Sequence, residues 1–255
     1  MPNVTPTFLD QHQYSYCELE KYEAIYGENF ISPGGMDTAL EFIGLLDPRS
    51  GERVLDIGCG FGGSALLMAR EYGARVHGID LSANMVATAV RRCYEAGAEG
   101  SVSLEQRDCL ELTANAEFDA VYSRDVFLHI HDKPKLYNTI HRALIPNGRL
   151  LFTDYACSNR AKSAGFLEYV EQRGYHLLRI EQYVDGLTAA GFTDIIAEDR
   201  SAQLLRIHER ELTTIETDPT VNSIAGDFAE LWRTKIARIR SGEHRWPMIR
   251  AKIPA

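Results

Sequence analysis

The sequence has the length of one large domain and the composition of a folded protein. Of its 255 residues, 45% are hydrophobic, 9% aromatic and 25% charged, and a chain of this size buries roughly three quarters of its unfolded surface. No apolar run reaches the roughly 18–20 residues that a membrane helix needs, so we expect no membrane insertion. The 36 acidic and 27 basic residues give a formal net charge of −9, which disfavours nucleic acid as a partner and favours a small-molecule substrate.

The cysteines and the first residues indicate the compartment. Five cysteines are scattered through the chain without a CxxC pair, which argues against both a disulfide framework and a thiolate metal site. The N-terminal residues lack the basic start and apolar stretch of a secretory signal. We expect a cytoplasmic monomer. We predict no metal, because no His, Asp or Glu cluster has the spacing of metal ligands.

In chain order, the pattern begins with helices and then alternates. Residues 1–45 look helical and carry four tyrosines, so we expect an N-terminal helical lid there. After residue 45, strands are expected at 53–58, 74–79, 102–105, 118–122 and 149–154, and helices at 64–72, 85–95 and 133–144. Strands that alternate with helices over short connections indicate an α/β fold: a mostly parallel, Rossmann-like sheet with helices on both faces.

The last hundred residues have a looser pattern. Helices are expected at 166–173, 180–190, 202–214 and 228–239, a strand at 194–197 and an extended segment at 244–253. We interpret residues 46–255 as one catalytic domain. Its inserted lid helices, at about 157–180 and 202–240, precede the last strand.

A glycine-rich turn follows the first expected strand. Four glycines lie between Gly58 and Gly63, Asp56 precedes them, and Asp80 ends the second strand. Glycines let a backbone approach a ligand closely, and a strand-end carboxylate can accept hydrogen bonds from ribose. Nicotinamide dehydrogenases and methyltransferases both fit this much, as does a tight turn without a ligand. Asp56 would repel a pyrophosphate but suits a sulfonium and an ammonium, which favours S-adenosyl-L-methionine as the cofactor.

A family resemblance extends over nearly the whole chain. The matching stretches are Phe8–Tyr14, Tyr26–Ser32 with Gly34 and Gly35, Val54–Gly63, His77–Asp80, Tyr122–His129, Thr153–Tyr155, Glu168–Tyr175 and Trp232–Lys235. In these stretches the chain resembles the phosphoethanolamine N-methyltransferases, in particular their short form with one catalytic domain. The resemblance implies a class I methyltransferase fold and S-adenosylmethionine-dependent conversion of phosphoethanolamine to phosphocholine in up to three methyl transfers. Residues 211–226 match no pattern of the family.

The same resemblance implies roles for individual residues. It implies that Tyr14 and His129 form the catalytic pair, with Asp125 beside them. It implies a grip on the substrate phosphate by Gln13, Tyr22, Tyr155, Tyr169, Arg173, Tyr175 and Lys235. It implies a cofactor pocket lined by Ile31, Ser32, Asp56, Gly58, Gly60, Asp80, Leu81, Asp108, Cys109 and Arg124. Asp108 also has an ordinary explanation as a helix cap.

The chemistry supports a base and an anion site. A primary amine with a lysine-like pKa near 10.4 is protonated at neutral pH, and freeing its lone pair costs about 4–5 kcal/mol. His129, with an ordinary pKa near 6.5, could take the proton, although a histidine in an apolar run is often only a core residue. A phosphate monoester needs charge-assisted donors, which Arg173 and Lys235 could supply, although both also read as solvated helix charges. A methyltransferase of glycine or sarcosine, a nicotinamide oxidoreductase and a cofactor-binding protein without turnover are the alternatives.

Overall fold

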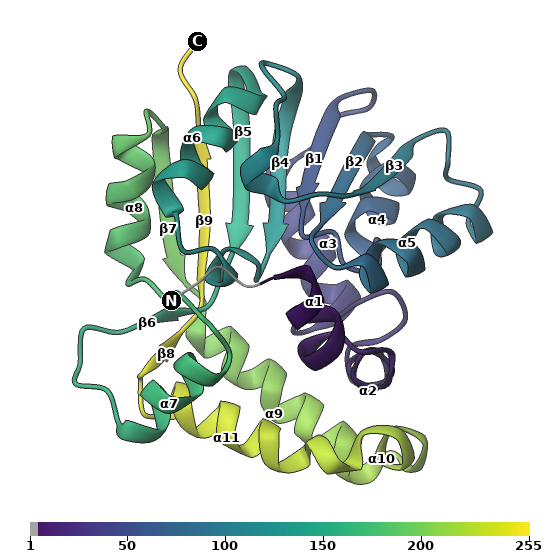
Figure 1. The fold of residues 1–255 in the computed structure, drawn as a ribbon, viewed down its shortest axis with the longest axis vertical. Helices are drawn as coiled ribbons and strands as arrows, with labels where there is room; N and C mark the ends of the chain where they lie inside the picture. The colour runs from purple at the N-terminus through teal and green to yellow at the C-terminus, as the bar shows by residue number, and fades with distance from the viewer. Residues whose placement is uncertain (1–4) are drawn as a thin grey trace.

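A seven-stranded sheet forms the centre of the molecule. The computed structural model describes residues 5–255, apart from the side chains of His12 and Gln13, so the expected substrate contact of Gln13 lies outside the described residues. The sheet contains β1 (Arg53–Ile57), β2 (Arg75–Asp80), β3 (Val102–Gln106), β4 (Phe118–Arg124), β5 (Leu144–Thr153), β7 (Thr193–Asp199) and β9 (Pro247–Lys252). Their order is β3-β2-β1-β4-β5-β9-β7 (Figure 1). Only β9 runs antiparallel to its neighbours among these strands, which confirms the predicted α/β fold with a mostly parallel sheet.

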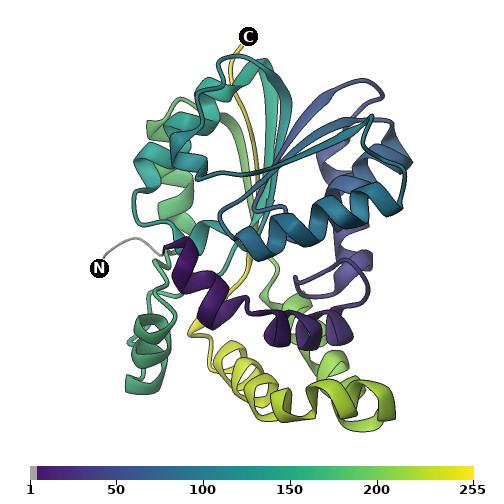
Figure 2. The ribbon, with the colours of Figure 1, turned by 45° about the vertical axis from the view of Figure 1, so that its right-hand side comes forward.

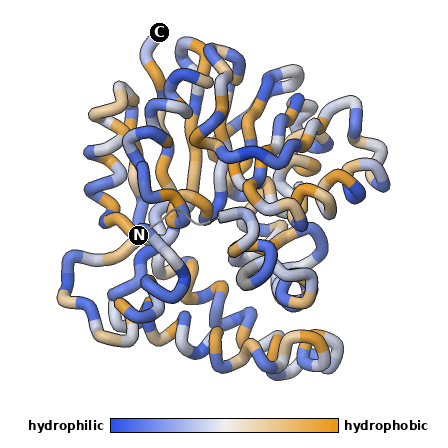
Figure 3. Tube along the Cα trace, viewed as in Figure 1, coloured by the Kyte–Doolittle hydropathy of each residue, from blue (hydrophilic) through white to orange (hydrophobic). Residues whose placement is uncertain are grey.

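Helices cover both faces of the sheet. One face packs against α3 (Gly35–Leu46), α4 (Gly63–Tyr72) and α5 (Ala83–Glu95), and the other against α6 (Lys133–Ala143) and α8 (Ile180–Ala189). The apolar residues of strand β1 contribute to both faces: Val54 joins the first core, whereas Leu55 and Ile57 join the second. Successive side chains of a strand point to opposite faces, so a sheet covered on both sides needs continuous apolar strands. The apolar colouring of the strands is visible in Figure 3.

A second layer lies beneath the carboxyl ends of the strands. It contains α1 (Pro6–Phe8), α2 (Tyr16–Tyr26), α7 (Ala164–Gln172), α9 (Ser201–Thr217), α10 (Pro219–Ala225), α11 (Ala229–Arg240) and the two-stranded ribbon β6 (Ala156–Cys157) with β8 (His244–Arg245). Figures 1 and 2 show α1 and α2 between the sheet and the α9–α11 group. None of the described helices is both long and apolar enough to cross a membrane.

Helix α10 occupies part of the segment for which the sequence pattern predicted nothing. Asp218 accepts hydrogen bonds from the backbone N–H groups of Thr220 and Val221, and Pro219 occupies the first turn. Both features are helix-start signals. The helix is only 7 residues long, which is too short for its apolar spacing to stand out.

The N-terminal residues divide into two parts. Helix α3 packs on the sheet like α4, with Phe42 and Ile43 fully buried, whereas residues 5–33 lie over the carboxyl ends of the strands. The side chain of Asn84 donates to the carbonyl of Tyr14 at 3.0 Å, and Arg92 bonds the carboxylate of Glu23 at 2.7 Å. We therefore propose a lid narrower than the expected 1–45, in which α3 belongs to the sheet layer.

Truncation of Phe42 tests this assignment. Phe42 is fully buried between α3 and the sheet and packs on Trp246, with ring centroids 5.5 Å apart. We expect Phe42→Ala to lower the free energy of unfolding by about 3–5 kcal/mol, because it leaves a cavity in the core. Leu40→Ala on the same helix, where Leu40 is 39% exposed, should change it by less than about 1 kcal/mol. Denaturant unfolding measures both, and equal losses would contradict the assignment.

Candidate active site

One pocket brings the predicted site residues together at the carboxyl ends of the strands. All of those whose side chains the structure describes line it: Tyr14, Tyr22, Ile31, Ser32, Asp56, Gly58, Gly60, Asp80, Leu81, Asp108, Cys109, Arg124, Asp125, His129, Tyr155, Tyr169, Arg173, Tyr175 and Lys235. Ligand sites of open α/β sheets lie at this edge, because the loops that leave parallel strands converge there. Among the described residues, no group of three or more His, Cys, Asp or Glu side chains is arranged to hold a metal ion.

The glycine turn after β1 is shaped by close backbone contacts. Gly58 and Gly60 have φ values of +73° and +52°, a region that strongly favours glycine. A Cβ on Gly58 would lie 2.2 Å from a methyl carbon of Val126, and one on Gly60 would lie 3.0 Å from Ile31. The glycines therefore keep the floor of the pocket thin, so that a ligand can lie against the backbone.

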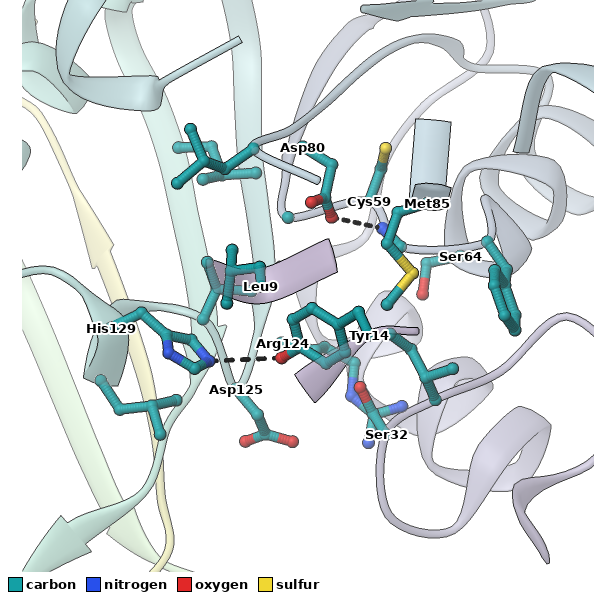
Figure 4. Close-up of a pocket in the computed structure, with 18 of the residues that line it drawn as sticks. Leu9, Tyr14, Ser32, Cys59, Ser64, Asp80, Met85, Arg124, Asp125 and His129 are labelled. Carbon is teal, nitrogen blue, oxygen red and sulfur yellow. Dashed lines mark hydrogen bonds between the residues drawn. The ribbon is translucent and has the colours of Figure 1, made fainter. Parts of the chain in front are cut away.

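Two carboxyl groups flank this turn: Asp56 is buried and Asp80 is half-buried. Asp80 accepts hydrogen bonds from the backbone N–H groups of Gly60 at 3.0 Å and Ser82 at 2.9 Å (Figure 4). Burial is the main cause that raises the pKa of Asp80 to about 6 and that of Asp56 to about 7. Asp56 Oδ2 has no hydrogen-bond partner among the described residues. The charged form of Asp56 therefore lacks compensation until a cation or a hydrogen-bond donor reaches it.

The segment that follows β3 forms one side of the pocket. Asp108 accepts a hydrogen bond from the backbone N–H of Leu110 at 2.8 Å and caps the short turn Cys109–Glu111. The ordinary explanation for this residue therefore holds, while the residue also lines the pocket. Cys109 is buried behind it, and its burial raises the pKa of the thiol to about 12, so the thiol stays protonated.

Asp125 follows β4 in a strained backbone conformation. Its φ of +55° is unusual for a residue with a side chain, and such strain is often found at functional sites. Oδ1 accepts hydrogen bonds from Trp246 Nε1 at 2.8 Å and Thr153 Oγ1 at 3.0 Å. Its other oxygen, Oδ2, is buried and has no partner in the part of the chain that the structure describes. One oxygen thus fixes the carboxyl group and leaves the second for a ligand.

His129 and Tyr14 meet across the pocket, as Figure 4 shows. The Tyr14 hydroxyl lies 3.3 Å from His129 Nε2, while Nδ1 is buried without a partner within residues 5–255. Burial, and then the charges of Lys133 and Arg173, lower the pKa of His129 to about 3. The expectation of an ordinary pKa near 6.5 was therefore wrong for the protein without a ligand. His129 is neutral there and acts as a hydrogen-bond acceptor.

The side chains of Asp154 and Lys133 fix the backbone around His129. The backbone N–H of Leu128 donates to the buried Asp154 at 3.1 Å, and Lys133 Nζ donates to the carbonyl of Ile130 at 2.5 Å. Lys133 Nζ also donates to the carbonyl of His176 at 3.0 Å. These two buried side chains fix the turn that carries His129 to the segment that follows α7.

The opposite wall of the pocket is cationic and rich in tyrosine. Arg173 hydrogen-bonds Tyr22 and is surrounded by the hydroxyls of Tyr169 and Tyr175. Lys235 Nζ lies 3.7 Å from the centroid of the Trp232 ring and 3.4 Å from the Tyr26 hydroxyl. Neither cation is a solvated helix charge. Burial is the main cause that lowers the pKa of Lys235 to about 7, with Glu211 opposing the shift.

Several lining residues were not expected from the sequence. Tyr26, Tyr122 and Met85 line the pocket, and Trp232 lies beneath Lys235. Tyr26 had been noted only as one of the four tyrosines of the lid. Apolar and aromatic residues at helical spacing look like core residues, so only their convergence in space shows that they belong to a pocket.

Comparisons with known proteins identify the class of this domain and then its family. A methyltransferase domain model matches residues 54–148, and with the fold it defines a class I methyltransferase. Phosphoethanolamine N-methyltransferase of Plasmodium falciparum (isolate 3D7) is 34% identical over 260 residues, which cover 98% of this chain and 96% of that protein. The chain belongs to the phosphoethanolamine N-methyltransferase family, as its sequence resemblance predicted.

Two further relatives show the extent of the match. Phosphoethanolamine N-methyltransferase 1 of Arabidopsis thaliana is 40% identical over 248 residues, 94% of this chain and 50% of the plant protein, so the chain spans about half the length of such relatives. Phosphoethanolamine N-methyltransferase 2 of Haemonchus contortus was solved with phosphomonomethylethanolamine and S-adenosylhomocysteine. It superposes with a TM-score of 0.95 at 36% identity, over 99% of this chain and 61% of that one.

Replacement of Asp56 should make the ligand-free protein more stable at high pH. The pKa of Asp56 is about 7 in the fold against 3.8 as its ordinary value, so the folded state holds an extra proton between these pH values. Stability from this group is present at low pH and is lost as the pH rises to 7. We expect Asp56→Asn to be more stable than the wild type by roughly 1–3 kcal/mol at pH 8 and by little at pH 4.

Urea unfolding at both pH values measures this difference. The exposed Asp185 offers the matched control, because Asp185→Asn makes the same chemical change away from the pocket. A gain for Asp56→Asn that is the same at pH 4 and pH 8 would contradict the assigned cause.

Proposed function

We propose that this chain is an S-adenosylmethionine-dependent N-methyltransferase that converts phosphoethanolamine stepwise to phosphocholine. One observation carries the proposal: Arg173 and Lys235 line the same pocket as Tyr14 and His129. A molecule with an anionic head and an amine tail would place each end against suitable groups. The proposal extends to the site roles listed above, including that of Gln13.

The residues around the glycine turn suit the proposed cofactor. S-adenosylmethionine, when bound, supplies a methyl group on a positively charged sulfur. The unpaired oxygen of Asp56 suits the cationic methionine part, and the strand-end carboxyl of Asp80 suits ribose hydroxyls. A dinucleotide would instead bring a pyrophosphate towards the buried Asp56, which disfavours the oxidoreductase alternative.

The cationic wall suits a phosphate better than a carboxylate. A phosphate monoester carries nearly two negative charges and three acceptor oxygens, which a half-buried arginine, a buried lysine and several tyrosine hydroxyls could satisfy together. Glycine and sarcosine carry one negative charge on a smaller group. The wall would then leave a buried cation uncompensated, so these amines are the weaker candidates.

Proton removal is the part of the reaction that Tyr14 and His129 would perform. An N–H of the substrate ammonium donates to the Tyr14 oxygen, and the Tyr14 hydroxyl donates to His129 Nε2. As the proton leaves nitrogen for the Tyr14 oxygen, the hydroxyl proton moves to Nε2, so Tyr14 stays neutral and His129 becomes cationic. The free electron pair on nitrogen would then form the new bond to the methyl carbon while the bond from that carbon to the cofactor sulfur breaks and leaves its electron pair on sulfur. His129 would afterwards release its proton to solvent. Asp125 lies beside the pair with one unpaired oxygen and can stabilise the positive charge.

The fixed anchor would permit repeated methylation. The phosphate stays the same while the amine gains methyl groups, and the quaternary product has no proton to lose and no lone pair to react. We also propose that the protein acts as a monomer in the cytoplasm.

A product profile tests the function directly. With excess S-adenosylmethionine, we expect mass spectrometry to find the mono-, di- and trimethylated products from phosphoethanolamine and none from ethanolamine. Lys235→Met removes the charge and keeps the side-chain stem over Trp232. It should raise the KM for phosphoethanolamine by about 10- to 100-fold, since a charged hydrogen bond contributes about 1.5–3 kcal/mol.

Arg233→Met is the matched control on the same helix, because Arg233 is half-exposed and pairs with Glu216 and Glu230. Methylation of glycine or ethanolamine at the rate of phosphoethanolamine would refute the substrate assignment. No methylated product from any amine would favour a binding protein without turnover.

Replacement of His129 tests the proton route. We expect His129→Gln to lower kcat for phosphoethanolamine by about 10²- to 10⁴-fold at pH 7.5, with a small change in KM. Activity should recover in part at pH 9.5, where solvent supplies more free amine. His131→Gln, at an exposed neighbouring position, should keep the wild-type profile. A variant of His129 with full turnover across this pH range would eliminate the route.

A further inference from the structure

Glu211 is a buried carboxylate with three hydrogen-bond partners from different parts of the chain. It lies on α9, is 4% exposed, and is the first residue of the segment 211–226, which matched no pattern of the family. Oε1 accepts from the backbone N–H of Gly34 at 2.8 Å, and Oε2 accepts from Trp232 Nε1 at 2.9 Å. His208 Nδ1 lies 2.8 Å from the same Oε2. Both oxygens are therefore engaged by groups that donate.

The hydrogen bond to Gly34 connects Glu211 to the side of the pocket that we propose binds the cofactor. Gly34 belongs to the 31–35 loop, whose residues Ile31 and Ser32 line the pocket. Arg124 holds the same loop from its other side and donates to the carbonyls of Pro33 at 2.9 Å and Gly35 at 3.4 Å. The 31–35 loop is thus held between the side chains of Arg124 and Glu211.

The hydrogen bond to Trp232 connects Glu211 to the side of the pocket that we propose binds the phosphate. Trp232 is fully buried, and its ring face carries Lys235 Nζ at 3.7 Å, three residues further along α11. The same ring packs on Tyr26 and Tyr22, with centroids 5.8 and 6.3 Å away. The bond from Trp232 Nε1 to Glu211 therefore helps to set where Lys235 lies.

We propose that Glu211 is a positioning residue that couples the two ends of the pocket, so that the cofactor and the phosphorylated amine each tighten the binding of the other. The inference rests on the proposed function for the identity of both ligands. A carboxylate is a rigid planar group, and this one is enclosed by the fold. A shift of the 31–35 loop on cofactor binding would therefore turn the carboxylate and move Trp232 with Lys235. By linkage, the effect on affinity is the same in both directions.

Glutamine cannot replace this residue in its role. An amide has one oxygen that accepts and one NH₂ group that donates. In either orientation of Glu211→Gln, the NH₂ group would face an N–H of Gly34 or of Trp232. One of the two hydrogen bonds is then lost while the size of the side chain is kept. The variant therefore separates the coupling of the two ligands from the packing of the side chain.

Binding measurements test the coupling without turnover. Calorimetry gives the Kd of S-adenosylhomocysteine with and without saturating phosphoethanolamine, and tryptophan fluorescence, to which Trp232 contributes, reports phosphoethanolamine binding. For the wild type we expect phosphoethanolamine to tighten S-adenosylhomocysteine by about fivefold or more. In Glu211→Gln the ratio of the Kd measured without phosphoethanolamine to the Kd measured with it should fall below about twofold. Glu209→Gln makes the same change two residues away, at a half-exposed side chain that pairs with Arg240, and should keep the wild-type ratio.

A second variant removes only the hydrogen bond from Trp232 to Glu211. Trp232→Phe lacks the indole N–H, so it should lose the ratio and weaken phosphoethanolamine binding while its affinity for S-adenosylhomocysteine alone stays unchanged. A lower melting temperature with the wild-type ratio, in either variant, would show a purely structural role and overturn the proposal. Wild-type protein that binds both ligands with no mutual tightening would also overturn it. Wild-type protein that binds neither would refute the proposed function and this inference together.

Discussion

Carboxyl groups from strand ends and cations from the helices beneath share one buried pocket. Asp56, Asp80 and Asp125 follow or end parallel strands, whereas Arg173 and Lys235 belong to the second layer. Each group has lost much of its hydration, and the loss is only partly offset by hydrogen bonds. The pKa of Asp56 is raised and that of Lys235 is lowered, so both move towards their neutral forms. The fold maintains this arrangement at a cost in stability, which ligands of complementary charge would offset.

The same burial explains why the surrounding structure is so heavily fixed. A lone buried polar group would reorient towards water if its backbone allowed it, so each has a second group that restrains it. Trp246 and Thr153 restrain Asp125, and the backbone around His129 is tied to Asp154 and Lys133. The lid is tied to the sheet layer by side chains of α5, where Asn84 donates to the carbonyl of Tyr14 and Arg92 bonds the carboxylate of Glu23.

The parts of the site that could be predicted from the sequence are the local ones. The glycine turn, Asp56 and Asp80 lie within short stretches in which strand, turn and acid follow one another, so their meeting is a consequence of a parallel sheet. Arg173 and Lys235 could be placed only through the family resemblance, because a cation on a helix has no local sign of burial. The pKa of His129 could not be predicted, since it depends on desolvation in the folded protein and on the charges of Lys133 and Arg173. Glu211 meets the backbone of Gly34 across 177 residues, and no spacing in the sequence indicates that contact.

The charge of Arg173 connects the proposed phosphate anchor with the proposed base, His129. Arg173 is one of the groups that keep the pKa of His129 low, so the cation that would bind the phosphate also makes the ligand-free histidine a poor base. A bound dianion would compensate the charge of Arg173 and thereby favour a proton on His129. The substrate would then supply, through its phosphate, part of the electrostatic change that deprotonation of its own amine requires. An amine without a phosphate would leave the charge of Arg173 uncompensated and His129 a weaker base, so the proposed selectivity would arise at the chemical step as well as in binding.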